Sequence, residues 1–425
     1  MPPSVPPMPD VSYHESRYDT NVNWTLGGDL AYVAACPAGP KSYSREIHMP
    51  VTIGVPAERA PGERRLALVP EVAARLIKLG ATIRIEAGAG KGAQIPDEEF
   101  KGCEIVEDAA AALSDADIVL TVQPPGTELL EHLKPGAVLV GYMQPHAQQA
   151  LVQALRDRKL TSFAMELIPR ISRAQSMDAL SSQGAIAGYK AALIAANTMD
   201  KFMPMLTTAA GTIRPAQVLV IGAGVAGLQA IATAKRLGAI VEAYDVRSAT
   251  REQVQSLGAK FVDTGVSAEG EGGYARELTD EEKARQQEAL DARIAVMDAV
   301  ITTAAIPGRP APRIISKDAV ERMKTGAVIV DIAAETGGNC ELTQPGETVV
   351  HNGVSIVGPV NIPSSLATHA SAMYARNLLN FLQPALKDGA LSIDWEDEVF
   401  AGAALTHDGE IRHAPTAKAI EGATS

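Results

Sequence analysis

The chain has 425 residues, of which 46% are hydrophobic and 21% charged, and its formal net charge is −12. This length predicts two or three domains, and this composition allows buried cores and excludes a chain that is disordered throughout. The negative charge disfavours nucleic acid and anionic lipid as partners, because their phosphates would be repelled.

The three cysteines, Cys36, Cys103 and Cys340, are scattered and form no CxxC pair. We therefore expect neither a disulfide framework nor a zinc site, and a reducing compartment is the simpler interpretation. No run of about 18 residues is apolar enough to span a bilayer, so we expect no direct membrane insertion.

The first fifty residues differ from the rest of the chain. They begin with the proline-rich stretch MPPSVPPMPD, which favours an extended conformation, and no basic segment precedes an apolar core as in a secretory signal. We interpret residues 1–50 as a flexible N-terminal extension. Our hypothesis is that Met49 lies close to the functional start; the alternative is a genuine flexible arm.

Strand and helix patterns alternate from Thr52 onward. The first series contains strand patterns at 51–55, 82–87, 117–126, 134–143 and 161–166. Helical spacing occurs between them, at 70–80 and 146–157. This βα repetition predicts a mostly parallel, doubly wound sheet.

A second series starts at Gln217 and has the same character. Its strand patterns lie at 217–221, 240–245, 260–262, 298–305, 327–333 and 354–358. The two series also resemble each other, since LKPGAVLV matches MKTGAVIV and DIVLTVQPPG resembles DAVITTAAIPG in the same order. We therefore predict an α/β protein with two Rossmann-like, doubly wound parallel-sheet domains and a cleft between them.

Two long helical segments connect these series. The apolar segment 185–199 is predicted to link the domains, and the segment 365–386 is predicted to return the chain to the first one. The expected domains are 51–182 plus 366–425, and 183–365. The alternative is that each half is closed in sequence.

The second series opens with a dinucleotide-binding pattern. Gly222, Gly224 and Gly227 form a GxGxxG motif that follows a strand and opens a helix. These glycines permit the turn, the approach of a pyrophosphate and close helix–strand packing, while the helix N-terminus favours phosphate. Asp245 ends the next strand, and its carboxylate can accept a hydrogen bond from a ribose 2′-hydroxyl. The same carboxylate would repel a 2′-phosphate, which favours NAD over NADP. Arg247 nearby could instead take a phosphate.

Several stretches together resemble one enzyme family. They are GVPAERAPGERRLALVP, RAQSMDALSSQ, IGAGVAGLQAIATAKRLGAIVEAYDVR, GGYARE, AAIPGRPAP and DIAAETGGNCE. The chain from about Val51 onward is similar to the family of alanine dehydrogenases and proton-translocating nicotinamide nucleotide transhydrogenases. The resemblance implies a nicotinamide-nucleotide oxidoreductase.

The two branches of this family differ in their need for proton-transferring groups. The resemblance implies that a Lys and a His serve alanine dehydrogenases, and the matching positions here are Gln123 and Gln144. Neither amide can carry positive charge or exchange a proton. Direct hydride transfer between two nicotinamides needs only orientation and exclusion of water. These positions favour the transhydrogenase branch; the alternative is an amino-acid dehydrogenase with Arg65 as its substrate cation.

The resemblance also implies the site residues. Arg170, Gln175, Asp178 and Ser181 match a polar run beside the nicotinamide, and Arg170 could pair with a pyrophosphate or with Asp178. The segment between Val262 and Asp291 matches a mobile loop that closes over the nucleotide with Tyr274 at its working end. Glu335 replaces a family Asp near the nicotinamide, so it is not among the predicted catalytic residues.

The predicted catalytic residues are Arg170, Gln175, Asp178, Ser181 and Tyr274. The predicted cofactor-binding residues are Arg170, Ile171, Ser172, Arg173, Gln175, Ser181, Ser182, Gly222, Gly224, Val225, Gly227, Asp245, Val246, Arg247, Gly273, Tyr274, Ala304 and Ala305. No metal site is predicted.

By resemblance, we expect the NAD(H)-binding component of a proton-translocating transhydrogenase, the first portion of a split alpha subunit. NADH would pass hydride to NADP⁺ held on a partner subunit. The expected partners are the membrane-spanning second portion of the alpha subunit and the beta subunit, together with a second copy of this chain in a homodimer. The expected location is cytoplasmic, peripheral on the inner face of the bacterial plasma membrane through those partners.

Overall fold

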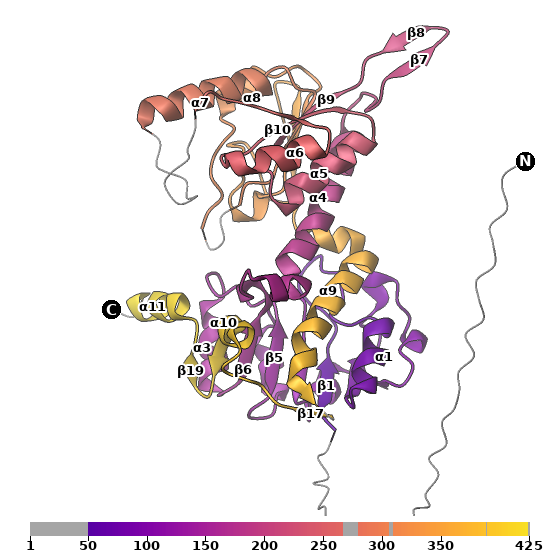
Figure 1. The fold of residues 1–425 in the computed structure, drawn as a ribbon. Coiled ribbons are helices and arrows are strands. Elements are labelled where there is room, and N and C mark those ends of the chain that lie inside the picture. Colours follow the sequence, from indigo (N-terminus) through magenta and orange to yellow (C-terminus); the bar gives the residue numbers. More distant parts are fainter. Residues whose placement is uncertain (1–49, 267–278, 306–308, 388, 424–425) are drawn as a thin grey trace, which may run out of the picture. The chain divides into compact units, whose positions relative to one another are not determined.

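The computed structural model of the protein describes residues 50–266, 279–305, 309–387 and 389–423. Its strands form an eight-stranded sheet, a seven-stranded sheet and two small two-stranded sheets (Figure 1). Parallel pairing dominates both large sheets, so the predicted α/β class with two doubly wound sheets is confirmed.

The first large sheet has the strand order β19-β18-β6-β5-β4-β1-β2-β3. Its strands are β1 (Thr52–Val55), β2 (Thr82–Glu86), β3 (Glu104–Val106), β4 (Ile118–Leu120), β5 (Val138–Gly141), β6 (Thr161–Ala164), β18 (Ala404–His407) and β19 (Glu410–Ile411). The order runs outward in both directions from the β1–β4 pair, which is therefore the topological switch point. The last two strands pair antiparallel, with β6 and with each other.

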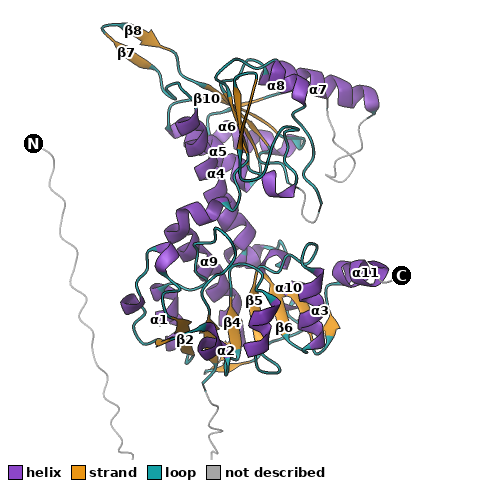
Figure 2. Cartoon of the chain, turned by 180° about the vertical axis from the view of Figure 1, so that it is seen from behind, coloured by secondary structure: helices purple, strands orange, loops and turns teal. Residues whose placement is uncertain are grey.

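Helices cover both faces of this sheet because successive strand residues point to opposite sides. Ile118 and Leu120 pack in one core cluster, whereas Val119 between them packs in another. The first cluster includes residues of α1 (Pro70–Lys78) and α9 (Ala367–Leu382), and the second includes residues of α2 (Ala109–Leu113) and α3 (Gln149–Asp157). The C-terminal helices are α10 (Glu398–Ala403) and α11 (Ala414–Ala423). Figure 2 shows these helices around the strands.

The second large sheet has the strand order β11-β10-β9-β12-β13-β15-β14. Its strands are β9 (Gln217–Ile221), β10 (Ile240–Tyr244), β11 (Lys260–Phe261), β12 (Ala299–Thr302), β13 (Val328–Asp331), β14 (Thr348–His351) and β15 (Val354–Val357). The central strand β9 again alternates between two cores: Val218 and Val220 face one, and Leu219 and Ile221 face the other. The helices are α4 (Ala179–Thr198) and α5 (Val225–Arg236) on the first face, α7 (Asp280–Ile294) and α8 (Lys317–Glu321) on the second, and α6 (Arg251–Ser256).

The internal repetition seen in the sequence corresponds to equivalent strands. The matched stretches place β4 between β1 and β5, and β12 between β9 and β13, with parallel pairing in every case. The repeat therefore marks the second half of each doubly wound sheet.

Some predicted boundaries were wrong. The helix expected from His146 begins at Gln149, because Gln144 adopts a positive φ of 46° and the chain turns before the helix. The linking helix begins earlier than expected, at Ala179, where the Asp178 side chain caps it. The second half of the predicted 262–291 loop belongs to α7, which begins with a capping box between Thr279 and Glu282.

Two small hairpins were not predicted. They are formed by β7 (Leu206–Thr208) with β8 (Gly211–Ile213), and by β16 (Leu386–Lys387) with β17 (Ala390–Leu391). The first hairpin lacks the alternation of apolar and polar residues because its residues are largely exposed.

Candidate nucleotide-binding site

The glycine motif lies in the expected strand–turn–helix context. Gly222 follows β9 with a φ of 94°, which a side chain would disfavour, and Val225 begins α5. A Cβ atom on Gly227 would lie 1.8 Å from the carbonyl oxygen of Gly222, so only glycine permits this contact between helix and turn. A Cβ atom on Gly224 would meet no described atom within 4 Å. The open side of the turn therefore lies at Gly224, at the N-terminus of α5, where the helix dipole favours an anion.

The carboxylate of Asp245 is tied to this turn. Its Oδ2 accepts a hydrogen bond of 2.7 Å from the backbone N–H of Ala223. Arg247 donates to the same carboxylate from its backbone N–H and from Nε and Nη2. Burial alone would raise the pKa of Asp245, but the hydrogen bonds from Arg247 and Ala223 outweigh it and hold that pKa below its usual value. Val246 between them is exposed.

The end of β12 is joined to the same turn. Thr303 Oγ1 donates a hydrogen bond of 3.1 Å to the carbonyl of Gly222. The next residue, Ala304, is half-buried and Ala305 is exposed. The carboxyl ends of β9, β10 and β12 thus meet at one edge, at the topological switch point where open α/β sheets bind ligands.

Sequence reasoning missed Asn339 in this region. Its fully buried side chain accepts a hydrogen bond of 3.1 Å from the Ala304 N–H and donates one of 2.8 Å to the Ala304 carbonyl. A third hydrogen bond reaches the carbonyl of Pro312. The amide thus fixes the backbone where β12 leaves the sheet. The glycine pair that precedes Asn339 in GGNC is typical of a tight turn, but nothing in the sequence indicates that the Asn339 amide bonds to Ala304.

The predicted polar run falls into two groups. Arg170 and Gln175 are exposed, and their side chains make no hydrogen bond or ion pair among the described residues. Ser172 is also exposed and Ile171 is half-buried.

The remaining side chains of the run already have partners. Asp178 accepts from the Ser181 N–H at 2.9 Å and from Ser181 Oγ at 2.5 Å, and so caps α4 rather than pairing with Arg170. Ser182 donates to Asn377, and Arg173 pairs with Asp397. Arg170 and Gln175 are therefore the long side chains of the run that are open to a ligand.

Two predicted residues, Gly273 and Tyr274, lie outside the described residues. Glu335 is exposed on a short 3₁₀ turn after β13. In the described portion of the chain, no group of three or more His, Cys, Asp or Glu is arranged to hold a metal. Within the same residues, no helix combines the length and the apolar character needed to cross a membrane.

A second polar cluster surrounds Arg65 near the first sheet. Arg65 is only 4% exposed, and Glu63 binds it through two hydrogen bonds, from Nε at 2.8 Å and from Nη2 at 2.6 Å. Gln183 and Asn361 accept further hydrogen bonds from its guanidinium. Burial alone would raise the pKa of Glu63, but its contacts with Arg65 outweigh it and lower the pKa to about 2. The positive charge of Arg65 is therefore already neutralised inside the protein.

The two glutamines of this region lie at the edge of the cluster. Gln123 Nε2 donates to Glu63 at 2.8 Å, and Gln144 Nε2 donates to Gln123 Oε1 at 3.3 Å. Their backbones are held by two glutamates that sequence reasoning did not single out. Glu58 accepts from the N–H groups of Val122 and Gln123, and Glu166 accepts from those of Met143 and Gln144.

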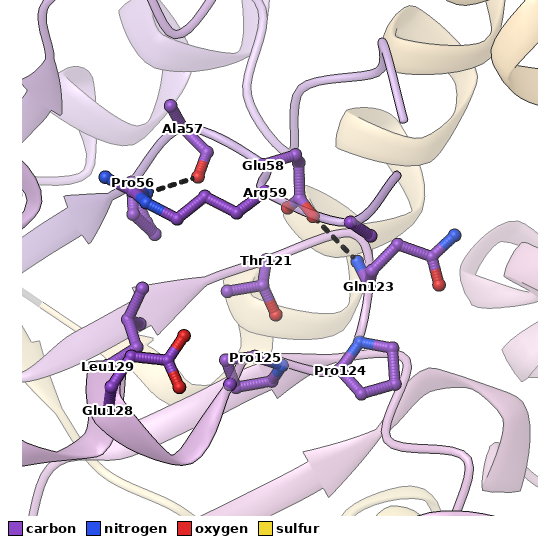
Figure 3. A pocket seen from close by; sticks show the side chains of 12 residues that line it. Pro56, Ala57, Glu58, Arg59, Thr121, Gln123, Pro124, Pro125, Glu128 and Leu129 are labelled. Carbon is purple, nitrogen blue, oxygen red and sulfur yellow. Dashed lines mark hydrogen bonds between the residues drawn. The ribbon is translucent and has the colours of Figure 1, made fainter. Parts of the chain in front are cut away.

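A pocket of about 230 Å³ lies beside this cluster, at the carboxyl ends of β1 and β4. Figure 3 shows the hydrogen bond that the backbone N–H of Gln123 donates to the Glu58 carboxylate. The side chain of Gln123 points away from Glu128. Burial raises the pKa of Glu58 to about 7. Arg59, also on the pocket wall, pairs with Glu86 at 2.8 Å.

Comparison with known proteins decides the family. The chain matches the family models for alanine dehydrogenase/PNT, with the N-terminal domain at residues 54–187 and the C-terminal domain at 191–414. The chain belongs to the alanine dehydrogenase/PNT family.

Within this family, curated relatives point to one branch. The chain is 50% identical over 374 residues to the first portion of the NAD(P) transhydrogenase subunit alpha of Rhodospirillum rubrum, and the match covers 85% of this chain and 97% of the relative. It is 28% identical to an alanine dehydrogenase of Halomonas elongata, over 87% of this chain and 96% of the relative. The chain lies in the transhydrogenase branch, and its enzyme class is NAD(P) transhydrogenase.

A solved structure of the family agrees. The transhydrogenase from Sinorhizobium meliloti superposes with a TM-score of 0.78 at 44% identity, covering 85% of this chain and 99% of that one. The recognition made from the sequence motifs is therefore confirmed, and so is the enzyme class. The roles of individual site residues stay predictions.

Proposed function

We propose that this chain binds NAD(H) at the turn 222–227 and that hydride passes directly from NADH to NADP⁺ held on a partner subunit. The observation that carries the proposal is the glycine turn, open at Gly224 and hydrogen-bonded to the acidic residue Asp245. An NAD ribose needs such a carboxylate, which would repel the 2′-phosphate of NADP.

The chemistry suits the side chains at hand. A C–H bond of the dihydronicotinamide breaks with its electron pair, and a C–H bond forms on the nicotinamide of NADP⁺. NADH is oxidised, NADP⁺ is reduced and no net proton moves, so the site needs no acid or base. Arg170 and Gln175 carry the open side chains of the polar run, and we assign them to orienting the nucleotide. Asp178, Ser181 and Ser182 hold the run in place.

The alternative, an amino-acid dehydrogenase, finds less support in the geometry. Its substrate carboxylate would need a free cation, and its amine a proton-transferring group. Arg65 is already paired with Glu63, and the neutral amides of Gln123 and Gln144 bond to the same cluster.

The assembly is also included in the proposal. Relatives whose names mark them as one portion of a divided alpha subunit support the existence of further subunits. We propose that the membrane-spanning second portion of the alpha subunit and the beta subunit couple hydride transfer to proton translocation. The chain would then be peripheral on the inner face of the bacterial plasma membrane.

A test of the proposed function uses Gln175→Asn, which shortens the side chain by one methylene and so moves its amide away from the nicotinamide ring of the bound nucleotide. We expect hydride transfer to slow at least about ten-fold, while NADH affinity stays within about two-fold. Stopped-flow absorbance with the NADP-binding subunit present measures the transfer, and titration of the isolated chain measures affinity. The matched control is Gln148→Asn, a change to an exposed glutamine at the start of α3.

Three results would contradict the proposal. Weaker NADH binding with an unchanged transfer rate would remove the assigned role of Gln175. Turnover of an amino acid with NAD⁺ by the isolated chain would favour the dehydrogenase. Failure of hydride exchange to depend on the NADP-binding subunit would remove the transhydrogenase mechanism.

A homodimer is proposed through the segment that carries the β7–β8 hairpin. Phe202, Met205 and Ile213 are 52%, 65% and 47% exposed, which is unusual for apolar side chains so close together in sequence. A second copy would cover them. Met205→Glu should therefore lower the dimer fraction in sedimentation velocity, whereas Val350→Glu, at an equally exposed valine on β14, should not. A wild-type chain that sediments as a monomer would remove the proposal.

A further inference from the structure

The hydrogen-bonding capacity of the Asp245 carboxylate is already filled. Oδ1 accepts from the Arg247 backbone N–H at 2.8 Å and from Arg247 Nε at 3.0 Å. Oδ2 accepts from the Ala223 N–H at 2.7 Å and from Arg247 Nη2 at 3.0 Å. Each carboxylate oxygen has about two acceptor sites, so four donors leave no room for a ribose hydroxyl.

The four donors differ in how easily they can leave. Two are backbone N–H groups, one of which belongs to the glycine turn and is fixed with it. The other two belong to the guanidinium of Arg247, whose side chain is 58% exposed, whereas that of Asp245 is 5% exposed. The guanidinium is therefore the group that can move away while the carboxylate stays in place.

We propose that Arg247 is an internal competitor for the ribose site and sets how strongly the site discriminates between NADH and NADPH. This inference rests on the proposed function. When the nucleotide binds, ribose hydroxyls replace the guanidinium of Arg247 on Asp245. The Arg247–Asp245 ion pair is broken in each binding event, which weakens the observed affinity. The guanidinium that is displaced remains beside the ribose and offsets the repulsion between Asp245 and a 2′-phosphate.

The experiment is Arg247→Gln in the full chain, with binding of NADH and NADPH measured separately by calorimetric titration. A half-exposed ion pair is worth at most about 1 kcal/mol, so we expect NADH to bind about two- to five-fold more tightly in the variant. Loss of the guanidinium charge beside the 2′-position should weaken NADPH binding, and the NADH-to-NADPH affinity ratio should rise about ten-fold.

Arg251→Gln is the matched control. It removes the same charge one turn further on, where Arg251 pairs with Asp263 at 2.9 Å and lies over Phe261 without touching Asp245. The control should leave the affinity ratio unchanged, and thermal unfolding checks that both variants fold.

The outcomes separate this inference from the proposed function. A higher affinity ratio with NADH affinity kept or increased supports the inference. An unchanged ratio, or NADH affinity that falls further than in Arg251→Gln, overturns it and makes Arg247 an ordinary nucleotide ligand. If the wild-type chain binds NADH and Arg247→Gln gives either of these two contradicting results, only the inference fails. If the wild type binds neither nucleotide, the proposed function fails as well.

Discussion

Glu63→Gln should lower the free energy of unfolding of the first sheet and its helices by about 3–5 kcal/mol, because it leaves the charge of Arg65 buried without its counterion. The Glu63 side chain is fully buried, and its Oε2 also accepts from Gln123 and Asn361. A glutamine would turn an amide nitrogen toward these donors. Denaturant unfolding measures the loss, followed through fluorescence of Trp395, which packs against this core, in a Trp24→Phe background.

The pH dependence of stability should change in the same variant. The pKa of Glu63 lies at about 2 in the folded protein, below its ordinary value of 4.5. A carboxyl with a lowered pKa stabilises the fold above its ordinary pKa, and this contribution disappears as the pH falls from about 4.5 through about 2. The difference corresponds to roughly 3 kcal/mol. The wild type should therefore lose stability over this range, and Glu63→Gln should lose less.

Two comparisons make this prediction specific. Glu71→Gln removes an exposed carboxylate that pairs with the exposed Arg75 and Arg376, and should leave the unfolding midpoint nearly unchanged. Glu63→Gln combined with Arg65→Met removes both buried charges and should be more stable than Glu63→Gln alone. A single variant as stable as the wild type would show that the Arg65 charge does not depend on Glu63.

The features of the site that the sequence could predict are those fixed by local chemistry. The three glycines and Asp245 lie within 24 residues, and their spacing alone indicates a strand, a turn, a helix and an acidic strand end. The structure reproduces this unit, including the positive φ of Gly222. The doubly wound sheets followed from alternating patterns that are equally local.

The features that could not be predicted depend on contacts between residues distant in sequence, or on competition between neighbours. The counterion of Arg65 is Glu63, only two residues away, but a short spacing does not show that the two side chains pair. The other partners of the guanidinium, Gln183 and Asn361, lie 118 and 296 residues away, so nothing near Arg65 reveals that it is enclosed by partners. Asn339 holds Ala304 from 35 residues away. The sequence places Arg247 close to Asp245, but only the geometry shows that its guanidinium donates hydrogen bonds to both oxygens of that carboxylate. Fold and motif were thus predictable, whereas the availability of each charge was not.

The glycine turn itself should separate nucleotide affinity from folding. Gly224 has φ and ψ of −79° and −166°, a conformation open to any residue, and a Cβ atom there meets no described atom within 4 Å. Gly224→Ala should therefore keep the unfolding midpoint of the wild type. If a pyrophosphate approaches this side of the turn, the added methyl group occupies its space, and NADH affinity should fall about ten- to a hundred-fold.

Gly227→Ala should behave in the opposite way. Its Cβ atom would lie 1.8 Å from the Gly222 carbonyl oxygen, so helix α5 must move away from the turn. We expect a loss of about 1–3 kcal/mol in stability, with NADH binding lost as a consequence. Calorimetric titration and thermal unfolding of both variants distinguish the two effects. If Gly224→Ala bound NADH as tightly as the wild type, the nucleotide would not approach the open side of the turn, and the proposed site would be wrong even with the fold intact.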